Sequence, residues 1–80
     1  MDVIQKSILV VLHSFFEQNK KEAASEKYIS NKLQINIYQV RVSLKELEKQ
    51  GYIKLINVVM ERITVSNITS EGRLAIKDNL

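Results

Sequence analysis

The first quarter of the chain carries one apolar face with a helical period. Between residues 2 and 19, apolar side chains recur three and four residues apart, which places them on one side of a helix. They are Ile4, Ile8, Val11, Leu12 and Phe15. The pattern predicts a first helix over this segment.

Two further amphipathic segments follow, and each begins at a residue that favours a helix start. Ser25 precedes a short segment that reaches about Leu33, and Asn36 opens a longer one that runs to Gln50. Gly51 then supplies the left-handed residue that ends many helices. Two helices joined by a turn of about three residues are typical of a helix-turn-helix arrangement.

After Gly51 the sequence changes from a helical period to that of strands. Residues 52–59 and 62–68 are rich in β-branched side chains, which predicts two strands joined by a hairpin near residues 59–62. Thr69 then caps a closing helix. The predicted order is helix, helix, helix, strand, strand, helix.

The composition is typical of one small globular domain. The chain has 80 residues, of which 45% are apolar and 26% charged, and its net charge of +3 permits binding to a polyanion. We expect a single domain over residues 1–80 of the α+β class, mostly α. Its predicted parts are a helix-turn-helix over about 25–50, a β-hairpin over about 52–68 and a C-terminal helix over about 70–79.

The chain lacks the residues that several classes of function need. It has no cysteine and a single histidine, His13, so we expect neither a disulfide nor a metal site. Gly51 and Gly72 are isolated, which leaves no glycine-rich phosphate loop. No Ser, His and Asp set can be proposed either. We therefore expect no enzyme, no cofactor and no small-molecule ligand.

The sequence also lacks the signals of a membrane or secreted protein. The longest apolar run, residues 8–12, is far shorter than the roughly 20 residues of a bilayer-spanning helix. The N-terminal residues lack the basic region and the cleavage site of a signal peptide. We expect no membrane association and a cytoplasmic location.

The third predicted helix has two distinct faces. Its core-facing arc, at 100° per residue, holds Ile37, Val40, Leu44 and Leu47. Its opposite arc gathers Tyr38, Arg41, Val42, Lys45 and Lys49. Cations beside a tyrosine and a methyl-bearing residue suit a DNA major groove, although a solvated lysine-rich face would show the same stripe.

Four segments, in order and spacing, resemble the winged-helix regulators, including MarR-like and PadR-like proteins. They are residues 28–36 (YISNKLQIN), 40–44 (VRVSL), 47–53 (LEKQGYI) and 63–74 (ITVSNITSEGRL). The resemblance implies a winged helix-turn-helix: a three-helix core, a two-stranded β-hairpin wing and a C-terminal helix.

The resemblance also implies that the third helix is a recognition helix that meets double-stranded DNA. Arg41 would then pair with guanine, Gln39 with adenine, and Val42 would pack on a thymine methyl. Lys45 and Lys49 would contact phosphate. The expected DNA-binding residues are Tyr38, Gln39, Arg41, Val42, Lys45, Lys49 and, from the wing, Arg62.

The first predicted helix carries more apolar surface than one core face needs. Two pairs of apolar residues, each seven apart, lie beyond its core arc, and such a stripe is typical of a helix–helix seam. These four residues are Val3, Val10, Leu9 and Phe16. We expect them to form a homodimer interface; the alternative is that the last helix and the strands cover them within one monomer.

Together these features favour a sequence-specific DNA-binding protein, a transcriptional regulator that acts as a homodimeric repressor. Two recognition helices related by a twofold axis would read half-sites about 34 Å apart. The alternative is a winged-helix protein–protein interaction module without DNA binding, in which Tyr38 and Val42 dock a partner.

Overall fold

A computed structural model describes residues 1–56 and 62–79 of the chain. In chain order its elements are α1 (Val3–Gln18), β1 (Ala24–Ser25), α2 (Glu26–Leu33), α3 (Ile37–Lys49), β2 (Ile53–Ile56), β3 (Thr64–Ile68), α4 (Ser70–Ala75) and the 3₁₀ helix η1 (Lys77–Asn79). The predicted α+β class is confirmed. Most of the predicted hairpin connection lies outside the described residues.

The helix boundaries follow from capping side chains. The side chains that accept a first-turn amide hydrogen bond are Asp2, Ser25, Asn36 and Thr69. At the other end of α3, Gly51 has a φ of +83°, in the left-handed region that glycine enters without steric cost. The predicted starts of α2, α3 and α4 are therefore confirmed.

The turn between α2 and α3 is built without glycine. Gln34 adopts the left-handed conformation there, with a φ of +57°. Its side-chain Nε2 donates to the Asn31 carbonyl at 2.8 Å, and the Ser30 hydroxyl donates to the Ile35 carbonyl at 2.6 Å. These bonds satisfy one backbone carbonyl in the last turn of α2 and one in the turn itself, and so fix the direction in which α3 leaves.

The sheet has three antiparallel strands in the order β1-β3-β2. The two wing strands were predicted. β3 begins two residues later than expected, and the predicted end of the first wing strand lies outside the described residues. β1 was not predicted, because two residues are too few to show an alternating pattern. It pairs Ala24 with Val65 and so fastens the start of α2 to the wing.

The last helix is shorter than predicted. α4 ends at Ala75, and η1 follows after Ile76, which has a φ of −115° outside the helical region. The Ile76 N–H donates to the Arg73 carbonyl, three residues back, at 3.3 Å. This tighter turn brings the fully buried Ile76 side chain into the core.

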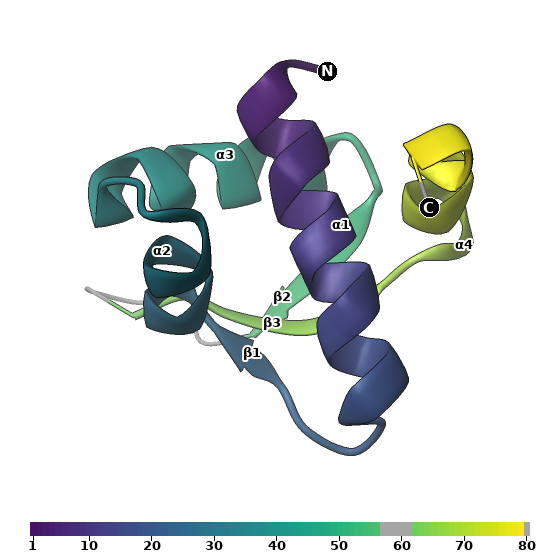
Figure 1. Cartoon of the computed structure of the whole chain (residues 1–80), viewed down its shortest axis with the longest axis horizontal. Helices are drawn as coiled ribbons and strands as arrows, with labels where there is room; N and C mark the ends of the chain where they lie inside the picture. Colours follow the sequence, from purple (N-terminus) through teal and green to yellow (C-terminus); the bar gives the residue numbers. More distant parts are fainter. Residues whose placement is uncertain (57–61, 80) are drawn as a thin grey trace.

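In Figure 1, α1 crosses the middle of the molecule, with α2 and α3 on one side and α4 and η1 on the other. It contacts α2, α3, α4 and β3, so most of its circumference is covered by other elements of the same chain. Leu9 is fully buried and Phe16 is 7% exposed. The expectation that these two residues lie on an exposed seam is wrong, because they belong to the core. Val3, in contrast, is exposed, and Val10 is partly buried.

Candidate nucleic-acid interface

The two faces of α3 differ sharply in burial. On the inner face, Val40, Leu44 and Leu47 are fully buried. On the outer face, Tyr38 is 68% exposed and Val42 is 65% exposed. Gln39, Lys45 and Lys49 are also exposed and complete this face, and the exposed acidic residues Glu46 and Glu48 lie beside it. The predicted orientation of α3 is therefore confirmed, and the structure brings five of the seven expected DNA-binding residues onto one accessible surface, the α3 outer face.

The ends of α3 are held by specific hydrogen bonds. At the start, Asn36 Oδ1 accepts the Tyr38 N–H at 2.7 Å. At the end, the Tyr52 N–H donates to the Leu47 carbonyl at 2.9 Å and the Gly51 N–H to the Glu48 carbonyl at 2.9 Å. These bonds satisfy terminal backbone groups, so the outer face is carried on a rigid element rather than a loop.

Arg41 lies in a different environment from its neighbours on α3. Its side chain is 22% exposed, and its Nε donates to Glu26 Oε2 in an ion pair between α3 and the first turn of α2. Its guanidinium carbon also lies 5.3 Å from the centre of the Tyr38 ring, within the range of a cation–π contact. The sequence predicted a guanidinium that projects toward DNA, whereas in the structure it is paired with Glu26 of the same chain.

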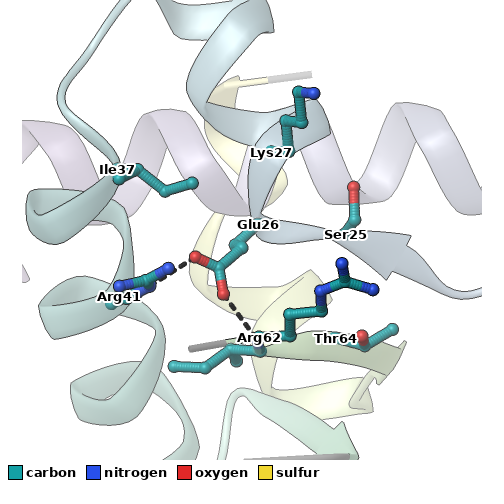
Figure 2. A pocket seen from close by; sticks show the side chains of 8 residues that line it. Ser25, Glu26, Lys27, Ile37, Arg41, Arg62 and Thr64 are labelled. Atoms are coloured by element: carbon teal, nitrogen blue, oxygen red, sulfur yellow. Dashed lines mark hydrogen bonds and ion pairs between the residues drawn. The ribbon is translucent and has the colours of Figure 1, made fainter. Parts of the chain in front are cut away.

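Glu26 is a functional candidate that the sequence did not reveal. Its carboxylate is buried, and its second oxygen, Oε1, accepts the N–H of Ile63, just before β3. The Glu26 N–H donates in return to the Ile63 carbonyl at 3.1 Å. Figure 2 shows the carboxylate between Arg41 on one side and the backbone just before β3, next to Arg62, on the other. Its partners lie 15 and 37 residues away in sequence, so no local spacing predicts them.

A pocket of about 480 Å³ opens beside this carboxylate (Figure 2). Its lining residues are Ser25, Glu26, Lys27, Ile37, Arg41, Arg62, Ile63 and Thr64. Three of these side chains are cationic and one is anionic. Because Glu26 is paired with Arg41, the lining carries a net positive charge. The pocket adjoins the α3 outer face.

The wing contributes one expected residue to this region. Arg62 is exposed and lies at the rim of the pocket, close to Ser25 and Thr64 in Figure 2. The structure thus places a wing cation beside the first turn of α2. The neighbouring residues 57–61 lie outside the described part of the chain.

Within residues 1–56 and 62–79, no three His, Asp or Glu side chains are grouped so that they could hold a metal ion. Across the same residues, no helix has the length and apolar character needed to cross a bilayer.

Comparison with known proteins identifies the fold family. The sequence profile of the winged helix DNA-binding domain matches residues 7–80, nearly the whole chain. The comparisons with curated proteins and with solved structures found no significant match. The narrower resemblance to MarR-like and PadR-like regulators stays a prediction. With a helix-turn-helix, a wing hairpin and this match, the chain belongs to the winged helix DNA-binding domain family.

Proposed function

We propose that this protein is a transcriptional regulator that binds specific double-stranded DNA as a homodimer and acts as a repressor. The observation that carries the proposal is the α3 outer face, on which Tyr38 is 68% and Val42 65% exposed, in a member of a DNA-binding family. A helix presented in this way has the dimensions and chemistry to enter a major groove.

The α3 outer face supports distinct roles for its residues. Gln39 would bond adenine, and Val42 would pack on a thymine methyl, because both side chains lie in the N-terminal half of the helix. Tyr38 would reach a base or the adjacent backbone. Lys45 and Lys49 would contact phosphate, since ammonium groups on flexible stems act as point charges.

Arg62 would contact phosphate from the wing. It is exposed at the rim of the cationic pocket, and Lys27 lies across that pocket on α2. Together they extend the positive surface from α3 to the wing. A duplex seated on α3 would pass over this region.

The dimer would form through α1 at its exposed N-terminal end. Val3 is 79% exposed, and a shallow groove of about 390 Å³ runs along this side of the helix. Its lining residues are Val3, Lys6, Ser7, Val10, Val11, Leu33 and Asn79. Burial of this apolar surface by a second copy would add stability that an 80-residue domain lacks.

Repression would be steric, by occupation of an operator. A protein with this activity works where DNA is accessible, which would place it in the cytoplasm.

A protein-interaction module is the second candidate, because the exposure of Tyr38 and Val42 also suits a partner protein.

A mobility-shift assay separates these two functions. A random duplex should be shifted at low salt, and the shift should weaken as salt rises, because phosphate contacts release counterions. Selection of bound genomic fragments should then yield a site with twofold symmetry. No shift at any salt concentration would favour the protein partner.

A further inference from the structure

Glu26 joins three parts of the proposed DNA interface. It sits in the first turn of α2, its Oε2 accepts from Arg41 of α3, and its Oε1 accepts from the backbone of Ile63 at the wing. Its side chain is only 6% exposed. A buried carboxylate that bonds partners from two other elements fixes the distance between those elements.

The same contact changes what Arg41 can offer to DNA. A guanidinium in contact with a buried carboxylate has its charge compensated locally, so its attraction for phosphate is reduced. Its 22% exposure contrasts with the 65% exposure of Val42, the next residue along the helix. Positive charge on the α3 outer face therefore comes from Lys45 and Lys49 rather than from Arg41.

Glu26 also sets the place of the wing cation. Ile63 exchanges two hydrogen bonds with Glu26, one to its side chain and one to its backbone N–H. Arg62 precedes Ile63 directly, so its backbone is anchored at the first turn of α2. The exposed Arg62 side chain can then face a duplex at a fixed distance from α3.

We propose that Glu26 is a positioning residue for DNA recognition: it holds Arg41 back from the duplex and locks the wing base to α2 and α3, which limits non-specific binding. This inference rests on the proposed function, because it assigns a role within that DNA interface. Specificity would then depend on Gln39, Val42 and Tyr38, with Arg41 acting only through Glu26.

The first test is Glu26→Gln, which keeps the size of the side chain and the acceptor for Ile63. The introduced amide cannot neutralise Arg41, so the guanidinium should become available to phosphate. We expect random-duplex binding to tighten several-fold. The slope of log K against log salt should steepen by about 0.9 per protomer, the value for one added phosphate contact. The affinity ratio of specific to random duplex should fall. A merely structural role would weaken both kinds of binding instead.

A matched control separates this effect from net charge. Glu46→Gln makes the same charge change at an exposed position on α3 itself. It should leave the salt slope at the wild-type value. Equal steepening in both variants would overturn the proposal, because charge alone would then explain it.

The double variant Glu26→Gln/Arg41→Gln keeps the test decisive even if Glu26→Gln folds poorly. It removes both charges, and two amides can bond each other in their place. The proposal expects a wild-type salt slope for the double variant, because Arg41 makes no phosphate contact in the wild-type protein. A slope shallower by about 0.9 per protomer would show that Arg41 contacts DNA directly and would overturn the proposal. That result would leave the proposed function intact, whereas failure of the wild-type protein to bind any duplex would overturn both.

Discussion

The backbone of Gly72 packs directly against the carbonyl of Tyr52. A Cβ on Gly72 would lie 2.2 Å from that oxygen and 2.9 Å from Cγ1 of Ile68. The same carbonyl accepts the N–H of Thr69 at 3.0 Å. This close approach seats the first turn of α4 on the residue before β2 and so ties the C-terminal helix to the wing.

We expect Gly72→Ala to be strongly destabilising, because the added methyl group meets backbone rather than a flexible side chain. Overpacking of this kind costs roughly 1–3 kcal/mol, which corresponds to a fall in Tm of about 4 °C or more in a domain of this size. Thermal unfolding followed by circular dichroism measures it. Gly51→Asn is the comparison, since Gly51 has open space around it and asparagine tolerates a positive φ. A smaller loss for Gly72→Ala than for Gly51→Asn would contradict the packing described here.

Thr69 should stabilise the folded protein through its hydroxyl. Its Oγ1 donates to the Gly51 carbonyl at 2.7 Å and accepts the Gly72 N–H at 3.0 Å. Thr69→Ala removes the helix cap and the link to the end of α3, and we expect a loss of about 1–2 kcal/mol in the free energy of unfolding. Urea titration gives this value. Thr69→Ser keeps the hydroxyl and should restore most of the stability; equal losses in the two variants would show that the methyl group matters instead.

The elements with a strong local signal were predictable from sequence. The starts of three helices could be predicted because Ser25, Asn36 and Thr69 are residue types that cap helix N-termini. The apolar period of α3 predicts which of its faces is buried. The core positions of Leu9 and Phe16 were missed, because a helical wheel does not show how many elements surround α1.

The candidate site was predictable only in part, because sequence periodicity does not show which elements pack against one another. The exposed residues of α3 follow from its period, but the pairing of Arg41 with Glu26 depends on how α2 and α3 cross. Contacts between residues far apart in the chain leave no periodic signal. The role of Arg41 could therefore be assigned only once the structure showed which residues surround it.

The proposed dimer makes a prediction for α1. Val10→Lys places a charge in the apolar groove that includes Val3, and it should weaken self-association by about tenfold or more, since an unpaired charge is costly to bury. Sedimentation equilibrium measures the dissociation constant. Lys6→Gln, at the rim of the same groove, is the control and should leave the dimer intact. A wild-type protein that is monomeric at all concentrations would contradict the dimer.

The most direct test of the central claim is the salt dependence of DNA binding, measured by fluorescence anisotropy for matched lysine variants. If a dimer neutralises about six to eight phosphates, the wild-type log–log slope should be about −5 to −7. Lys45→Gln/Lys49→Gln should make that slope shallower by about 3 to 4 units, because up to four contacts per dimer are lost. Lys20→Gln/Lys21→Gln changes the charge equally in the loop after α1, well apart from α3 in Figure 1, and should leave the slope unchanged. Equal slopes for the two double variants would contradict recognition by the α3 outer face.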